Sequence, residues 1–297
     1  MGSLGTLVKR NCKLFFKDKV MFFTSLITPI VLLVLFGTFL ANVYRDSIVS
    51  AIPEGFSVSE AIINGAVGGQ LVSSILAVCC VTVAFCSNFL IVQDKIEGSR
   101  RDLDMCPVSS STLALGYFLA SAICTLLICY IGFAACLGYL YAVGWYLSIS
   151  DVLFLCLDIF ISVLFGTALS SIINCNLTSN GQVTAVGTII SAGYGFICGA
   201  YMPIHSFAQG LQDFLSYIPC TYATGLFRNH ALGGVLDEML TTGLPSECVD
   251  GFRDSLDCNL SFLGNNVSIE SMYGVVIATL VVLIVLYILI SKIKKNK

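Results

Sequence analysis

Charged residues are scarce in this 297-residue sequence, and their scarcity excludes an ordinary soluble domain. Asp, Glu, Lys and Arg make up only 11% of the chain, whereas hydrophobic residues make up 57%. Soluble domains carry about 25% charged residues. An aqueous fold could not bury so much apolar surface. The composition therefore predicts a polytopic membrane protein.

Histidine is scarcer still, and the glycine-rich motifs that bind nucleotide phosphates are missing. Neither G-x-x-x-x-G-K-[ST] nor G-x-G-x-x-G occurs, so we expect no ATP hydrolysis by this chain alone. The two histidines, His205 and His230, fall outside the predicted spans, which disfavours an intramembrane serine protease. A membrane enzyme that depends on either histidine is the least favoured function. We therefore expect no catalytic residues and no cofactor in this chain.

The fourteen cysteines lack the spacing of a metal site. No C-x-x-C pair occurs, so we expect no bound zinc or iron–sulfur cluster. Most of the cysteines fall in or beside apolar segments, where cysteine behaves as a small buried hydrophobe. Cys248 and Cys258 differ because both lie in a polar segment, where an oxidising compartment would permit a disulfide. Spacing alone cannot fix pairing, so a disulfide and two free thiols both remain open.

Long apolar runs are what the chain has in abundance. A helix needs roughly 20 mostly apolar residues to cross the hydrocarbon core of a bilayer. Six windows meet that requirement, and they predict an all-α protein with six transmembrane helices. The predicted spans are residues 20–42, 66–92, 113–143, 152–173, 183–201 and 273–290.

The few basic residues are distributed unevenly, and their positions predict the topology. Twelve of the fifteen Lys and Arg residues lie in the first nineteen residues, the loop 93–111 and the last six residues. Cytoplasmic loops carry an excess of Lys and Arg. We therefore expect a multi-pass protein of the cell membrane with both termini, and the loop after the second span, in the cytoplasm.

Two segments outside the spans also show helical periodicity. Residues 1–19 place apolar and basic side chains on different sides, which predicts an amphipathic helix on the inner membrane surface. A basic flank that only sets orientation is the alternative. Residues 203–234 divide into two short apolar pieces, the second ending at Gly233 and Gly234, and they predict a re-entrant or interfacial pair. The polar residues 235–272 are then an extracellular loop.

Asp158 is the only ionisable residue within the six windows. Intramembrane acids mark ion or substrate pathways, or they form hydrogen bonds with a neighbouring helix. An ion-coupled secondary transporter would depend on Asp158, although carriers of that kind usually hold several such groups. Aromatic and sulfur side chains near the outer end of the fifth span would suit an apolar substrate. The candidate substrate path consists of Asp158, Tyr194, Phe196, Tyr201 and Met202.

The most specific local pattern lies in the loop after the second span. Ile96, Leu103 and Cys106 could form one apolar edge of a short helix that Pro107 ends. Such a charged helix would suit docking, whereas a solvated turn that only fixes topology is the alternative. The residues that form the pattern are Glu97, Gly98, Leu103, Pro107, Val108 and Ser109.

The chain combines this pattern with six predicted spans, a basic N-terminal helix and a re-entrant pair. In this combination it resembles the permease subunit of the type-2 family of ATP-binding cassette (ABC) transporters. The resemblance covers nearly the full chain. It implies that residues 94–107 form a coupling helix that docks in a separately encoded ABC ATPase, beside the connecting helix 1–19. The coupling residues would be Glu97, Gly98, Arg101, Leu103 and Pro107.

The resemblance also implies partners and a direction of transport. Two ATPase copies, which bind ATP and Mg, would work with two permeases, as a homodimer or a related heterodimer, in a lipid bilayer and without nucleic acid. The chain would then export an amphipathic or hydrophobic substrate such as a drug, lipid or peptide. An ATP-dependent exporter, an ion-coupled carrier and a membrane enzyme are thus the three functions in competition.

Overall fold

The computed structural model describes residues 3–52, 58–262 and 264–295, and helices dominate it. The first half contains α1 Ser3–Lys17, α2 Lys19–Leu35, a π-helix at Phe36–Leu40, α3 Ala41–Ala51, α4 Glu60–Asn88, α5 Leu90–Ile96, α6 Ser99–Met105 and α7 Ser110–Val143. The second half contains α8 Ile149–Asn174, α9 Asn180–Ile197, a 3-10 turn at Ile204–Ser206, α10 Gln209–Ser216, α11 Pro219–Thr241, α12 Ser246–Ser255 and α13 Ile269–Lys295. A two-stranded antiparallel hairpin pairs β1 Ser261–Phe262 with β2 Asn265–Asn266.

Five helices of the described chain are long and apolar enough to cross a membrane. They are 19–46, 60–96, 110–143, 149–174 and 269–293. These helices confirm an all-α, polytopic membrane protein. The predicted fifth span, 183–201, corresponds to α9, which is shorter and begins with the polar residues Asn180, Gly181 and Gln182. The sixth crossing therefore stays a prediction.

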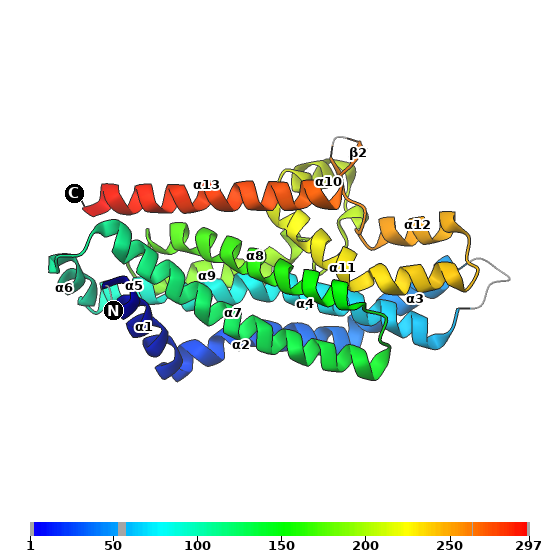
Figure 1. Ribbon diagram of the computed structural model, residues 1–297, viewed down its shortest axis with the longest axis horizontal. Helices are drawn as coiled ribbons and strands as arrows, with labels where there is room; N and C mark the ends of the chain where they lie inside the picture. The colour runs from blue at the N-terminus through cyan, green and yellow to red at the C-terminus, as the bar shows by residue number, and fades with distance from the viewer. Residues whose placement is uncertain (1–2, 53–57, 263, 296–297) are drawn as a thin grey trace.

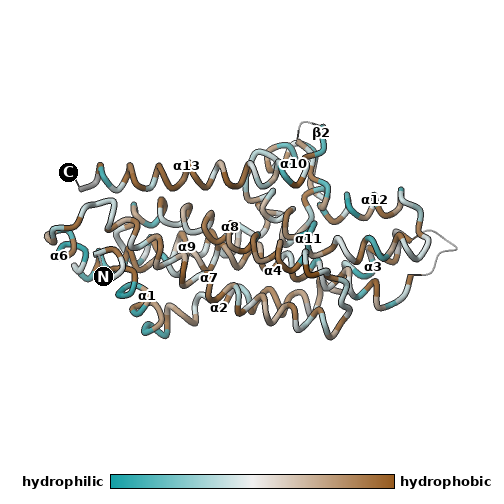
Figure 2. Tube along the Cα trace, viewed as in Figure 1, coloured by the Kyte–Doolittle hydropathy of each residue, from teal (hydrophilic) through white to brown (hydrophobic). Residues whose placement is uncertain are grey.

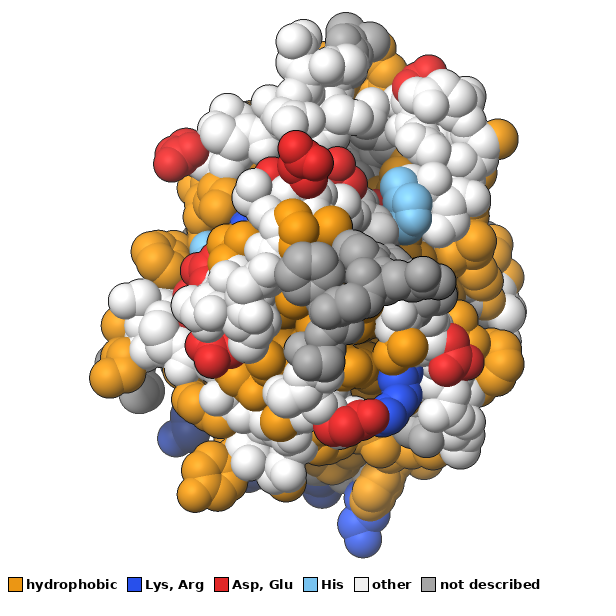
Figure 3. Space-filling model, turned by 90° about the vertical axis from the view of Figure 1, so that its right-hand side faces the viewer, with side chains coloured by type: hydrophobic (Ala, Val, Ile, Leu, Met, Phe, Trp, Pro, Cys, Tyr) orange, Lys and Arg blue, Asp and Glu red, His pale blue; other side chains and the backbone are white. Residues whose placement is uncertain are grey.

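The long helices run side by side along the long axis of the molecule (Figure 1). One end holds α1, α6 and the end of α13, and we call it the basic end. The other end holds α3 and α12, and we call it the acidic end. Apolar residues line the long helices between these ends, while polar residues gather at α1, α6 and α12 (Figure 2). Acidic side chains spread over the acidic end in Figure 3.

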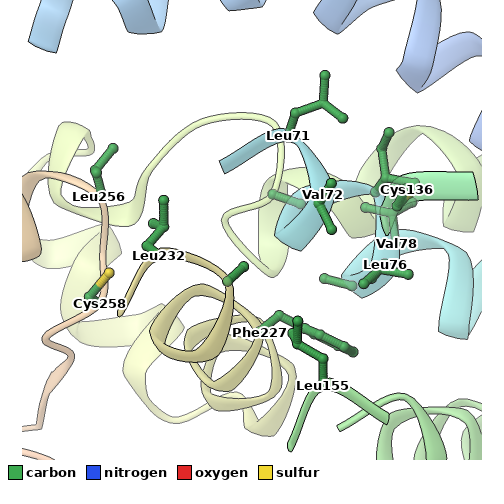
Figure 4. Close-up of a cluster of buried hydrophobic side chains, with 14 of the residues drawn as sticks. Leu71, Val72, Leu76, Val78, Cys136, Leu155, Phe227, Leu232, Leu256 and Cys258 are labelled. Carbon is green, nitrogen blue, oxygen red and sulfur yellow. The ribbon is translucent and has the colours of Figure 1, made fainter. Parts of the chain in front are cut away.

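The α4 helix is the centre of the bundle. It packs against α2, α7, α8 and α11, and 89% of its most apolar stretch is buried. No charged residue occurs between Glu60 and Asp94, so the helix can be surrounded on all sides without burying an unpaired charge. Leu71, Val72, Leu76 and Val78 of α4 meet residues of α7, α8 and α11 in the core (Figure 4).

The outermost helices contrast with α4. Only 19% of the most apolar stretch of 19–46 and 22% of that of α13 are buried. A helix that is apolar all round suits either a protein core or contact with lipid. Because these two helices expose Leu, Ile, Val and Phe side chains, lipid or another permease would have to cover them in a membrane.

The segment between α9 and α13 differs from its sequence prediction. The first predicted piece corresponds to the 3-10 turn and α10, but α11 continues past Gly233 and Gly234 as far as Thr241. Gly234 lies directly against the backbone oxygen of Tyr146, where a Cβ atom would clash. This glycine therefore permits close packing within a helix and does not cap the helix end. The expected extracellular loop 235–272 accordingly begins inside α11 and also contains α12.

Candidate functional site

The loop after the second span forms an elbow of two short helices at the basic end. Helix α5 ends at Ile96 and α6 begins at Ser99, so the predicted single helix at 94–107 is interrupted. Gly98 lies at the turn with a φ of 85°. This left-handed conformation is accessible to glycine and strained for most other residues. Glu97 and Gly98 of the sequence pattern thus define where the chain changes direction.

An ion pair between a half-buried arginine and a buried aspartate attaches this elbow to the N-terminal helix. Arg10 of α1 donates to both carboxylate oxygens of Asp94, at 2.7 and 3.0 Å, and the hydroxyl of Tyr117 in α7 donates to Asp94 Oδ2 at 2.5 Å. These hydrogen bonds raise the pKa of the Arg10 guanidinium above its ordinary value. Three elements separated in sequence therefore meet at one carboxylate, which we call the Asp94 clamp.

Lys95 ties the elbow to a fourth element. Its Nζ donates to the backbone oxygens of Asn174, Cys175 and Leu177, at 3.3, 2.6 and 2.9 Å. The carbonyl groups of Asn174 and Cys175 lie at the C-terminal end of α8, which attracts a cation, and Leu177 lies in the loop that follows. Lys95 therefore acts as a cap for α8 as well as a topology signal.

Apolar contacts complete the attachment of the elbow. Leu103 of α6 and Val108 pack against a buried cluster that contains Leu7 of α1 and Tyr117 of α7. The guanidinium of Arg100 lies 5.6 Å from the centre of the Tyr117 ring, within cation–π range. The position of α6 is thus fixed by packing as well as by charge.

The outward side of the elbow presents a mixed surface. Glu97, Arg101 and Pro107 are exposed, and Met105 is 78% exposed at the tip of α6. The five predicted coupling residues therefore separate into two groups: Gly98 and Leu103 shape and attach the elbow, whereas the other three face outward. The expected apolar edge is not formed, because Ile96 and Cys106 are exposed while Leu103 is half-buried.

The sequence interpretation did not single out the residues of the Asp94 clamp. Arg10 and Asp94 are 84 positions apart, so spacing gives no indication that they meet. One available signal was the position of Asp94, which directly follows a long uncharged run. Such an acid at the end of a span needs a partner, and the amphipathic helix 1–19 carries several basic residues.

Away from the elbow, Asp158 within α8 is buried with partners for both carboxylate oxygens. Tyr273 of α13 donates to Oδ1 at 2.5 Å, and Nδ1 of His230 in α11 lies 2.7 Å from Oδ2. The His230 ring stacks on Phe154 at 5.0 Å between centroids. This arrangement matches the second interpretation of Asp158, as an acid hydrogen-bonded to neighbouring helices.

A second buried acid organises the acidic end. Arg228 of α11 donates to Asp257 at 2.6 Å and to the backbone oxygen of Gly199 at 2.5 Å. Asp257 also accepts from the backbone N–H groups of Ile204 and His205. Burial favours the neutral acid, but Arg228 and these hydrogen bonds outweigh it and lower the pKa of Asp257. We call this arrangement the Asp257 lock.

An apolar groove runs between α2 and α9 and continues towards the acidic end. It consists of two cavities of about 900 and 610 Å³ that share Val31, Leu32, Leu35, Ser191, Ala192 and Tyr201. Phe196, Tyr201 and Met202 of the predicted substrate path line the larger cavity. Tyr194 is buried and Asp158 is enclosed by its partners, and neither lines these two cavities.

The cysteines of the acidic end are free thiols in the structure. Cys248 is half-buried and Cys258 is buried, and burial raises the pKa of the Cys258 thiol to about 12. A thiol with so high a pKa is a poor nucleophile near neutral pH. Throughout the described ranges, no group of three or more His, Cys, Asp or Glu residues is arranged to hold a metal ion.

Comparison with known proteins gives one family. The model of the family described as "ABC-2 type transporter" matches residues 2–231, which is well over half of the chain. The match begins before α1 and ends within α11, so it includes the elbow, the Asp94 clamp, and α2 and α9 of the groove. Phe252, Ser255 and Leu256, which also line the larger cavity, lie beyond it. A search of curated proteins finds no match.

Proposed function

The chain belongs to the ABC-2 type transporter family, and on that premise we propose that it is the permease subunit of an ATP-driven exporter. The family supports association with a separate ABC ATPase in a membrane. In this proposal two ATPases and two permeases form the working unit, and ATP and Mg bind only to the ATPases. The basic end faces the cytoplasm, as the distribution of Lys and Arg indicates.

The observation that carries this proposal is the attachment of the elbow. A docking element transmits force only if it is firmly attached to the helices that it must move. The Asp94 clamp, the Lys95 cap and the packing of Leu103 connect α5 and α6 to α1, α7 and α8. At the same time Glu97, Arg101 and Met105 remain exposed for a partner. Rigid attachment on one side and exposure on the other favour a coupling element over a solvated turn.

Mechanical coupling then follows from this arrangement. ATP binding closes the ATPase dimer and draws the two elbows together. Each elbow displaces α1 through Arg10, α7 through Tyr117 and α8 through Lys95, because these side chains make the direct contacts. The bundles rock, and the groove between α2 and α9 alternates between access from the inside and from the outside.

The groove supports an amphipathic or hydrophobic substrate. Its walls are formed mainly by Leu, Val, Phe and Met side chains, with Tyr201, His205 and a few hydroxyl groups. Ligand pockets for drug-sized molecules occupy about 300 to 1,000 Å³, and the larger cavity falls within that range. In this proposal α2 and α9 line most of the path, and the central α4 borders it at Cys86.

Charge reversal on the exposed side of the elbow tests the coupling role. We expect Glu97→Lys to abolish permease-stimulated ATP hydrolysis by the ATPase in proteoliposomes while the permease still inserts. Gly98→Pro should do the same, because proline cannot adopt a φ of 85°. The matched control is Glu247→Lys, which reverses an exposed acid at the acidic end and should leave stimulation unchanged. Wild-type stimulation in both elbow variants would refute the assignment.

One observation favours a second function, an ion-coupled carrier. Asp158, His230 and Tyr273 form a buried group of titratable side chains between α8, α11 and α13. Buried acids of this kind serve proton pathways in other transporters. A carrier would move substrate without ATP and would respond to substitution of Asp158, whereas the exporter requires ATP. Transport assays with and without ATP in sealed vesicles separate the two.

A further inference from the structure

Two asparagines at the contact between α1 and α4 are almost completely buried, and each has an unpaired polar atom. Asn11 and Asn88 are each 1% exposed. Asn11 Oδ1 accepts from Arg10 at 2.9 Å, while Asn11 Nδ2 finds no partner within the described chain. Asn88 Nδ2 donates to Ser170 and Ser171 at 2.9 and 2.7 Å, while Asn88 Oδ1 is unpaired among the described residues. One asparagine thus offers a free donor and the other a free acceptor.

The partners of each amide fix its orientation. Arg10 can only donate, so the atom of Asn11 that faces it must be the oxygen. The backbone oxygen of Thr167 lies 3.5 Å from Asn88 Nδ2 and can only accept. Rotating either amide by 180° would therefore break contacts that already exist. The free donor on Asn11 and the free acceptor on Asn88 are consequences of these contacts.

Both asparagines line the same small cavity. Its volume is about 10 Å³, and its other walls include Phe15 of α1, Ser87 of α4, and Tyr117 and Ser121 of α7. A cavity of about 10 to 15 Å³ holds one water molecule, provided that two to four polar partners surround it. The volume is too small for any larger ligand. The Ser87 hydroxyl already contacts the backbone oxygen of Ala84 and the hydroxyls of Ser121 and Thr125, so the two amide atoms are the polar groups of this cavity that still lack a partner within the described chain.

We infer that this cavity binds one structural water, which accepts a hydrogen bond from Asn11 Nδ2 and donates one to Asn88 Oδ1. A dry cavity would leave both amide atoms unpaired, so each would bear the full desolvation penalty of a buried polar group. A bridging water removes that cost at a small loss of entropy. The inference concerns the contact between α1 and α4 and is independent of what the protein transports.

The water extends the attachment of the N-terminal helix to the central helix. Arg10 already connects α1 to Asp94, and Phe15, which is 1% exposed, packs beside α4 and α7. Asn11 lies between Arg10 and Phe15 in the sequence, and the water adds a polar link from Asn11 to Asn88. Asn88 in turn bonds to Ser170 and Ser171, so the link continues from α1 through α4 to α8.

A double-mutant cycle tests the bridge. The purified full-length permease and its Asn11→Ala, Asn88→Ala and doubly substituted variants are unfolded by heat in nanodiscs. The two amides make no direct hydrogen bond. If they share a water, the melting temperature of the double variant should fall by clearly less than the sum of the falls in the two single variants. The control cycle pairs Asn11→Ala with Asn174→Ala, since Asn174 also has an unpaired oxygen but does not line the cavity. We expect additive losses there.

A density map of the unsubstituted protein gives a second, independent readout that does not require any variant to fold. In a map that resolves other internal waters, we expect a peak within hydrogen-bond distance of Asn11 Nδ2 and Asn88 Oδ1. Additive losses in the Asn11 and Asn88 cycle, or an empty cavity in such a map, would overturn the inference.

Discussion

The Asp94 clamp at the basic end and the Asp257 lock at the acidic end use the same chemistry for different purposes. Each holds a buried aspartate against an arginine. Only 1% of the Arg228 side chain is exposed, whereas 32% of the Arg10 side chain is exposed. Arg228 also belongs to a helix packed within the bundle, while Arg10 belongs to a separate helix along its side. Under the proposed function, the Asp257 lock fixes structure, whereas the Asp94 clamp transmits movement of the elbow to α1.

The largest effect on stability should come from the Asp257 lock. Replacing Arg228 with Ala leaves Asp257 buried without its cation, and breaking a buried pair costs about 3–5 kcal/mol. We expect the melting temperature of the permease in nanodiscs to fall by on the order of 10 °C. Arg253→Ala is the control, because its ion pair with Asp237 lies at the surface. Equal stability of the Arg228 and Arg253 variants would contradict the proposed difference between lock and surface pair.

Disrupting the Asp94 clamp should lower stability less than disrupting the Asp257 lock, but it should impair the stimulation of ATP hydrolysis more. Arg10→Ala removes two hydrogen bonds to Asp94, but Tyr117 still donates to that carboxylate, and water can reach the site. We expect a loss of about 1–2 kcal/mol, smaller than that of Arg228→Ala. Stimulation of ATP hydrolysis by the permease should nevertheless fall severalfold, because the elbow is no longer attached to α1. Lys9→Ala, on the same helix, should change neither stability nor stimulation.

The outcome that would remove the distinction is a large stability loss in Arg10→Ala together with unchanged stimulation of ATP hydrolysis. Both ends would then be structural locks, and the coupling role of the elbow would lose its support.

The smallest effect concerns acid stability. The pKa of Asp257 is lowered in the folded protein, so its ionised form stabilises the fold above the unfolded pKa of about 3.9. This contribution is lost as the pH falls through the lowered folded value. We therefore expect the difference in melting temperature between the unsubstituted protein and Asp257→Asn to be constant above about pH 4 and to shrink below it. A difference that does not change with pH would show that folding does not lower the pKa of Asp257.

The long helices could be predicted from the sequence because their signal is local. Uncharged runs of about 20 residues identify spans without knowledge of their neighbours, and five of the six predicted windows coincide with long apolar helices. The fifth window gives a weaker signal for a span, because α9 begins with polar residues and carries four glycines, Gly181, Gly187, Gly193 and Gly195. Its path depends on what covers its exposed face, which a single chain does not determine.

The contacts of the site could be predicted only in part, because they join distant segments. Gly98 was identified from a short pattern, and the structure explains its place by a left-handed turn. The partners of Asp158, by contrast, are His230 and Tyr273, which lie 72 and 115 positions away. Their positions depend on how α11 packs, and the sequence prediction ended α11 too early, at Gly233 and Gly234, of which Gly234 permits close packing against Tyr146.

Cys106 offers the most direct test of the central claim, that the exposed side of the elbow lies in the cytoplasm and seats in an ATPase. Among the described cysteines, Cys106 alone is exposed, and it lies beside Met105 at the end of α6. We expect a membrane-impermeant maleimide to label Cys106 in inside-out vesicles and not in right-side-out vesicles, with Cys106→Ser as the control. Bound ATPase should protect the thiol. Labelling from the outside, or full labelling in the presence of the ATPase, would contradict the account.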